Sequence, residues 1–112
     1  MTGTPAATAT PAILMLPPDA PPQILWVQMS STTPQSGDVV SAVVLTSSNV
    51  ASVELRVGGY GFPLSKTDVG RFEGSYQVPQ VPFFMSHSFV MLVIARNTAG
   101  IGAQTALGMQ IR

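Results

Sequence analysis

The residue types that carry catalysis and metal binding are scarce in this chain of 112 residues. It has one histidine, His87, so a cluster of histidine ligands around a metal is impossible. A Ser-His-Asp arrangement would need Asp19, Asp38 or Asp68 to converge on that histidine. The acidic residues fall on expected turns and outward strand faces, so they indicate no general acid and base pair. We therefore expect no enzyme activity and assign no catalytic, cofactor-binding or metal-binding residue.

The sequence also lacks other common features of metal-binding, phosphate-binding and nucleic-acid-binding sites. The chain contains no cysteine, which excludes disulfides and thiolate metal sites. The glycine-rich run at residues 58–61 is followed by neither a lysine at the required spacing nor an expected helix, so it does not predict a phosphate-binding loop. With five basic and five acidic residues, the chain lacks the positive charge that binds nucleic acid or an anionic membrane. Charged residues make up only 9%, a composition that suits packing against neighbours.

Aromatic residues provide one candidate binding surface. Four of them fall in expected loops or strand edges: Tyr60, Phe62, Phe83 and Phe84. Rings exposed at such positions can stack on sugars, so carbohydrate binding is one hypothesis for this chain. The alternative is that the rings plug the open ends of a β-structure, where each one buries a large apolar area.

The longest apolar run, residues 88–95, predicts a central β-strand with both faces covered. One parity of this strand is expected to fill the core. The other parity carries three apolar side chains on the opposite face: Val90, Leu92 and Ile94. We expect them to lie near the outward apolar residues of the strand at 39–46. Because large uncovered apolar patches are rare on soluble monomers, the N-terminal segment, another domain or another copy should cover these side chains.

Residues 1–22 are dominated by threonine, alanine and proline, which is typical of an extended linker or docking segment. Four apolar residues within it are interaction candidates: Ile13, Leu14, Met15 and Leu16. They predict either a tether that carries a short apolar contact site or a strand that docks onto a sheet edge of its own chain or of a neighbour. The apolar run is too short to span a bilayer, and no basic region of an export signal precedes it.

Short alternating segments, spaced by roughly 8–12 residues, predict one β-sandwich domain in residues 23–112. The expected strands span residues 24–29, 39–46, 53–57, 71–78, 88–95 and 103–111, with a short edge strand or a loop at 58–64. Residues 66–70 and 97–102 predict turns, and no helical period of adequate length is present. Prolines just before residue 24 favour an edge position for the first strand.

Four segments, in this order and spacing, resemble the bacterial immunoglobulin-like domains of secreted and surface proteins. They are SGD at 36–38, NVASVEL at 49–55, DVGRFEGSYQVP at 68–79 and VIARNTAG at 93–100. The resemblance covers about residues 23–112 and implies an immunoglobulin-like Greek-key sandwich of about seven strands. Domains of that family commonly serve as spacers, stalk units or accessory modules and share no catalytic residues.

Together these features predict a non-catalytic structural or interaction module of a secreted or cell-surface protein, without a cofactor. The expected partners are other copies or adjacent domains of the same protein, held by apolar and strand-edge contacts in a tandem spacer or a filament. The alternative is a carbohydrate-binding accessory domain that uses the loop aromatics. Neither a nucleic-acid partner nor a membrane span is expected.

Overall fold

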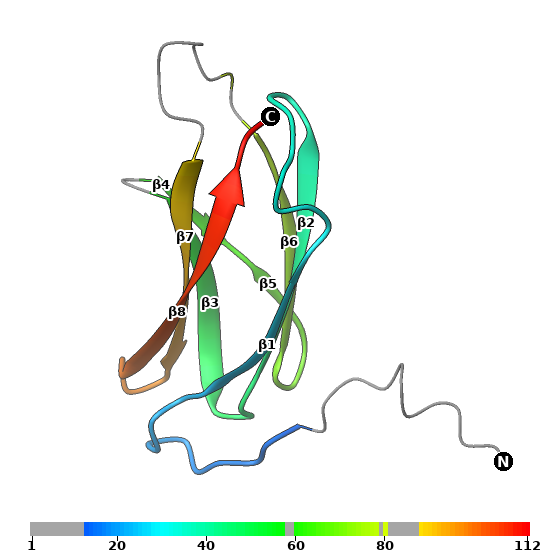
Figure 1. Cartoon of the computed structure of the whole chain (residues 1–112). Helices are drawn as coiled ribbons and strands as arrows, with labels where there is room; N and C mark the ends of the chain where they lie inside the picture. The colour runs from blue at the N-terminus through cyan, green and yellow to red at the C-terminus, as the bar shows by residue number, and fades with distance from the viewer. Residues whose placement is uncertain (1–12, 58–59, 79, 81–87) are drawn as a thin grey trace, which may run out of the picture.

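The computed structural model describes residues 13–57, 60–78, 80 and 88–112, which form an all-β fold. The strands are β1 (Ile24–Met29), β2 (Val39–Thr46), β3 (Val50–Val57), β4 (Tyr60–Pro63), β5 (Ser65–Asp68), β6 (Arg71–Gln77), β7 (Ser88–Asn97) and β8 (Gly102–Gln110). They make two antiparallel four-stranded sheets, ordered β1-β2-β6-β5 and β4-β3-β7-β8, which pack against each other (Figure 1). The part of the chain that the structure describes includes no helix long and apolar enough to cross a membrane.

The strand order is that of an immunoglobulin-like Greek-key sandwich. In such folds, strands A, B, E and D form one sheet and strands C, F and G form the other. The first sheet here has that order, and the second has it with β4 added beside β3. The predicted fold class is therefore confirmed, and the described residues contain eight strands where about seven were expected.

The core lies between the two sheets and is built from alternate residues of their strands. In β7, which pairs with β3 on one side and β8 on the other, Met91, Val93 and Ala95 are fully buried. The largest fully buried side chains are Phe72 of β6 and Leu55 of β3, one from each sheet. The prediction of a central strand in the longest apolar run is confirmed.

One predicted turn is only partly confirmed. Residues 66–70 were expected to form a turn, but Ser65–Asp68 form β5, which pairs with β6 at the edge of the first sheet, and only residues 69–70 form the turn. All four residues of β5 are exposed, so the strand has no apolar alternation by which sequence could reveal it. The first strand does lie at a sheet edge, as the preceding prolines predicted.

The chain crosses from one sheet to the other at Leu64, between β4 and β5. The Leu64 amide donates to the carbonyl of Val53 in β3 at 2.9 Å, while the next residue, Ser65, pairs with β6. The Leu64 side chain packs against the core and approaches Gly74, where an added Cβ would lie 2.7 Å from it. This crossover connects the two sheets on the β4–β5 side of the sandwich.

Candidate interaction surfaces

Residues 13–23 form a strap across one end of the sandwich, called the N-terminal strap from here on (Figure 1). The Ser48 amide, between β2 and β3, donates to the carbonyl of Leu14 at 2.8 Å, and the Leu16 amide donates to Ser48 Oγ at 2.9 Å. Leu14 and Leu16 are half-buried, whereas Ile13 and Met15 are 49% and 73% exposed. The four apolar candidates therefore lie in a segment that is hydrogen-bonded to its own sandwich.

A cluster of buried polar side chains anchors the strap. The side-chain amides of Asn49 and Asn97 both donate to the carbonyl of Ala20, at 2.6 and 2.9 Å. Ser47 exchanges hydrogen bonds with Gln23: its amide donates to the Gln23 carbonyl, and its hydroxyl oxygen accepts from the Gln23 amide, both at 2.9 Å. The Ser47 hydroxyl in turn donates to Asn49 Oδ1 at 2.7 Å. A buried polar group that loses its partner costs about 1–3 kcal/mol, so this cluster holds the strap in place.

Asn97 also organises the turn between β7 and β8. Its Oδ1 accepts from the amides of Ala99 at 3.0 Å and Ile101 at 2.9 Å, while its Nδ2 reaches the strap. One side chain thus ties the strap to the β7–β8 turn. Sequence reasoning identified Asn97 only as part of a turn, because its long-range partner is 77 positions away in the chain.

The outward side chains of β7 do not form the apolar patch that the sequence predicted. Val90 is 58% exposed, but Ile94 is only 9% exposed and Leu92 is half-buried. The outward residues of β2, expected nearby, belong to the other sheet and face the opposite side of the molecule. The N-terminal strap lies at the end of the sandwich and hydrogen-bonds to its turns, so it is not the cover that these side chains were expected to need.

Charged side chains flank Ile94 instead. Glu54 of β3 lies directly opposite Ile94 in the strand register. Its carboxylate oxygen Oε1 lies 3.2 Å from Arg56 Nη2 and 4.0 Å from Arg96 Nη1. On its other side, Ile94 lies opposite Gln104 of β8, so long polar side chains, which can cover apolar surface with their stems, stand on both sides of this outward isoleucine. Of the three outward residues, Val90 alone remains more than half exposed.

The aromatic candidates separate into a packed ring and an exposed ring. Phe62 packs against the core and stacks on Tyr76, with ring centroids 5.3 Å apart and an angle of 30° between the planes. Tyr60 is 75% exposed. Burial raises the pKa of the Tyr76 phenol, whose hydroxyl has no hydrogen-bond partner among the described residues. Phe83 and Phe84 lie outside the described residues.

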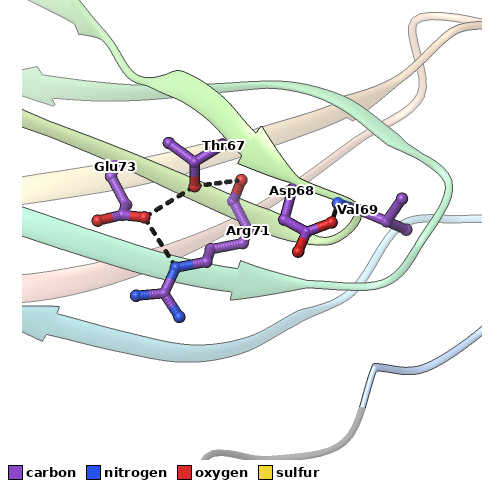
Figure 2. A network of polar contacts seen from close by, with 5 residues as sticks. All are labelled: Thr67, Asp68, Val69, Arg71 and Glu73. Carbon is purple, nitrogen blue, oxygen red and sulfur yellow. Dashed lines mark hydrogen bonds and ion pairs between the residues drawn. The ribbon is translucent and has the colours of Figure 1, made fainter.

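A polar network ties the edge strand β5 to β6 (Figure 2). Glu73 Oε2 accepts from Arg71 Nε and from the Thr67 hydroxyl, both at 2.8 Å. The hydrogen bond from Arg71, followed by that from Thr67, holds the pKa of Glu73 below its ordinary value. Nearby, Asp68 Oδ1 accepts from the Val69 amide at 2.7 Å and shapes the turn that follows β5. The network connects two neighbouring strands on the solvent-facing side of their sheet.

The free edge of β8 follows from its hydrogen-bonding pattern. The Asn97 amide donates to the Ile101 carbonyl at 3.0 Å, and the antiparallel register continues from that pair to Ala95 opposite Ala103 and onward. Bonding pairs alternate along such a ladder, so residues 103, 105, 107 and 109 bond to β7 and the residues between them direct N–H and C=O away from it. The Gln110 amide shows this direction, because it donates to Thr32 in the β1–β2 connection at 2.9 Å.

Four residues of β8 remain without a neighbouring strand among those described, and we call them the β8 edge: Gly102, Gln104, Ala106 and Gly108. Beside them lies an apolar groove between β1 and β8 of about 340 Å³, lined by Ile24, Leu25, Trp26, Val27, Thr105, Ala106 and Leu107. Thr105 is exposed although its parity directs it toward the sandwich interior, because the sandwich is open here. An added strand would satisfy the backbone groups of the β8 edge and place side chains in the groove.

The residues considered for catalysis are dispersed. Asp19 belongs to the strap, Asp38 immediately precedes β2, and Asp68 ends β5, and all three are exposed. His87 lies outside the described residues. Within the described ranges, no three histidine, cysteine or acidic side chains come together as metal ligands would. The surfaces described above are therefore the features from which function can be argued.

No protein-family model matches this sequence, and a search of curated proteins finds no significant match. The function proposed below rests on the fold, the β8 edge and the strap.

Proposed function

We propose that this chain is a non-catalytic structural module that acts through strand-edge and apolar contacts. The β8 edge carries this proposal, because its four residues direct unpaired backbone groups outward beside an apolar groove. Unpaired edges bind extended strands through backbone hydrogen bonds, and grooves beside them accept alternate side chains. The module serves as a tandem spacer or as a self-assembling subunit, with other copies or adjacent domains as its partners.

The proposed setting is a secreted or cell-surface protein. Support comes from the resemblance of four sequence segments to bacterial immunoglobulin-like domains, with which an immunoglobulin-like strand order agrees. The low charged fraction of 9% is a second supporting observation, since charge-poor surfaces favour packing against neighbours. Fold alone does not determine function, so the setting is argued from these features together.

The path of the chain suits a spacer. The N-terminal strap lies at one end of the sandwich, and β8 leads to Arg112 at the other end (Figure 1). The strap and the C-terminus are both hydrogen-bonded to the sandwich: the strap to Ser48 and Asn97, and the Arg112 amide to the Pro34 carbonyl at 2.8 Å. A module with its two attachments at opposite ends can hold its neighbours a fixed distance apart.

Sedimentation velocity over a concentration series, combined with a glycan array, tests this proposal. Reversible growth of the sedimenting species with concentration supports the self-assembling form. A monomer that binds no glycan supports the spacer form. A monomer that binds a defined glycan, and loses that binding in Tyr60→Ala without a change in melting temperature, overturns the proposal.

Carbohydrate binding is the second candidate, and the exposed ring of Tyr60 favours it. Phe62 provides a matched control, because its ring is already stacked on Tyr76 inside the sandwich. Tyr60→Ala should weaken sugar binding and leave stability unchanged. Phe62→Ala should lower the melting temperature by removing packed apolar area. If both variants behave alike in binding and in melting, the ring of Tyr60 has no special role.

A further inference from the structure

We infer that the β8 edge pairs with the β8 edge of a second copy, antiparallel and around a two-fold axis at Thr105. This inference rests on the proposed function, because it names the partner of the strand-edge contact. Three observations carry it: the uncharged edge, the point at which the free part of the edge stops, and the groove beside it.

The β8 edge lacks the features that normally prevent strand addition. Edge strands of monomers are commonly protected by charged side chains, prolines or bulges. β8 contains no charged residue and no proline, and its register with β7 runs without a shift from Gln110 to Gly102. Like charges directly opposite each other destabilise a strand pair, and two copies of this edge present none. Self-pairing is therefore free of electrostatic repulsion along the whole edge.

The free residues of the edge are symmetric about Thr105. Antiparallel pairing around that residue places Gly102 opposite Gly108 of the second copy and Gln104 opposite Ala106. All four residues direct their backbone groups outward, so each of the four resulting pairs exchanges two hydrogen bonds, about eight in total. On the outer face, the only long side chain, that of Gln104, lies opposite a small one. The pairing satisfies the entire β8 edge.

The occupied end of β8 argues against a shifted axis. An axis at Ala106 would place Gly102 opposite Gln110 of the second copy. The Gln110 amide already donates to the Thr32 carbonyl at 2.9 Å, so that position is covered by the β1–β2 connection. A shift to Ala106 therefore loses the outermost pair at both ends and brings the connection against the incoming strand. The axis at Thr105 uses the free residues and no others.

The groove supplies the apolar part of the contact. At the axis, Thr105 faces its counterpart in a non-hydrogen-bonded pair with Cα atoms about 4.5 Å apart, and threonine pairs at such positions are favourable. The axis is perpendicular to the extended sheet, so the two grooves, each about 340 Å³, face each other and close. Because the same surface is used on both copies, the assembly is a closed dimer and not a filament.

Engineered cysteines test the axis directly, since the chain has no cysteine of its own. Under mild oxidation, Thr105→Cys should form a disulfide-linked dimer, because a Cα separation of about 4.5 Å lies within the disulfide range of about 4.4–6.8 Å. Ala106→Cys is the matched control. In the proposed dimer, the Cα atoms of residue 106 in the two copies lie diagonally across the strand pair, about 7–8 Å apart. This separation exceeds the disulfide range, so the Ala106→Cys chains should stay unlinked.

Charge substitutions test the register without oxidation. Gln104→Lys or Ala106→Glu alone should weaken dimerisation about five- to tenfold in sedimentation equilibrium, because each introduces an unpaired charge at the contact. An equimolar mixture of the two variants should recover affinity, since the substituted positions lie opposite each other in the mixed dimer. Ser75→Lys, on an exposed position of β6 in the other sheet, should leave the dimer unchanged.

The outcomes separate this inference from the proposed function. A linked dimer with Thr105→Cys and none with Ala106→Cys supports the axis at Thr105, provided that both variants melt like the parent chain. Linkage with Ala106→Cys alone overturns that axis. A monomer at every concentration, unlinked in both variants, overturns the dimer but leaves the spacer form of the proposed function standing. Glycan binding through Tyr60 overturns the proposed function independently of the cysteine results.

Discussion

The two open sides of the sandwich are built in contrasting ways. On the β4–β5 side, both strands have four residues, and they include Pro63, Lys66 and Asp68. The register between β5 and β6 is also irregular between Lys66 and Asp68. On the β1–β8 side, β8 has nine uncharged residues, no proline and an unbroken register. One side thus carries most of the known protections against strand addition, and β8 carries none of them.

The features that prevent strand addition are therefore distributed unequally between the two open sides of this charge-poor sandwich. The few charges available, 9% of the residues, are concentrated on β5 and β6 and in the cluster of Glu54, Arg56 and Arg96. At the opposite edge, beside an apolar groove, no strand among the described residues pairs with the β8 edge. The contrast favours the β1–β8 side as the contact surface of the proposed function, and three predictions test it.

The largest effect is expected from proline at adjacent positions of β8. Thr105 bonds to β7, so Thr105→Pro should lower the free energy of unfolding by about 1–3 kcal/mol, because the ladder hydrogen bond is lost and the Val93 carbonyl is left without its donor. Ala106 directs its N–H away from β7, where proline is tolerated, so Ala106→Pro should cost about 1 kcal/mol or less. Urea denaturation measures both values.

Equal losses for the two proline variants would contradict the assignment of the β8 edge. The Ala106→Pro variant also removes one donor from the free edge without adding charge. It should therefore remain monomeric at concentrations where the parent chain dimerises. Sedimentation of the same samples checks this result alongside their stability.

A smaller effect is expected at two turn glycines, one on each side of the sandwich. Gly70, after β5, and Gly100, before β8, have φ angles of +69° and +86°. Alanine in this left-handed region costs about 1–2 kcal/mol. At Gly70 the added Cβ would also lie 2.7 Å from the backbone oxygen of Thr46, whereas Gly100 faces open space. Gly70→Ala should therefore destabilise the fold more than Gly100→Ala does.

Thermal or urea unfolding of the two alanine variants provides the measurement. Gly70→Ala is expected to be the more costly change because the backbone is crowded at the β5–β6 turn. At this turn the Thr46 amide also donates to the Gly70 carbonyl at 2.8 Å. If Gly100→Ala were as costly as Gly70→Ala, the β7–β8 turn would be as tightly packed as its counterpart. The contrast between the two sides would then not extend to their turns.

The smallest effect is expected from Glu73→Gln, which weakens the network between β5 and β6. The hydrogen bonds from Arg71 and Thr67 lower the pKa of Glu73 from its ordinary 4.5, so its carboxylate favours the folded state above that pH. This contribution is lost as pH falls through the folded-state pKa. The parent chain should be slightly more stable than the variant at pH 7, and the difference should shrink in acid below pH 4.5. A difference independent of pH would contradict the role of the carboxylate charge.

Much of the fold could be predicted because apolar patterns are strong over long strands. Residues 24–29 and 39–46 were predicted as strands, and the structure places β1 and β2 on those residues. The strand β5 escaped prediction because its four exposed residues resemble a turn. The alternation along β7 correctly indicated which side chains face outward, yet Ile94 is only 9% exposed, and its cross-strand neighbours, Glu54 and Gln104, follow only from strand register.

The candidate surfaces were less predictable than the strands. The sequence alternatives for the N-terminal segment were a tether or a strand on a sheet edge, whereas residues 13–16 form no strand and hydrogen-bond to the turn between β2 and β3. The anchors of the strap, Ser47, Asn49 and Asn97, have the same residue types as ordinary turn formers. A strand-edge contact was also predicted, but the sequence did not indicate which strand would make it. That assignment requires the sheet order and the hydrogen-bonding direction of each residue, neither of which a single sequence encodes locally.

The position of the strap has a mechanical consequence. Tension applied between the strap and the C-terminal end of β8 would act along the strands, because β1 begins at the strap and β8 ends on the far side (Figure 1). The hydrogen bonds of the β1–β2 and β7–β8 ladders would then be sheared together and share the force. They would not open one after another as in an unzipping hairpin. In the proposed spacer, the attachments at these two ends would therefore load the strands in shear, the direction in which paired strands resist stretching.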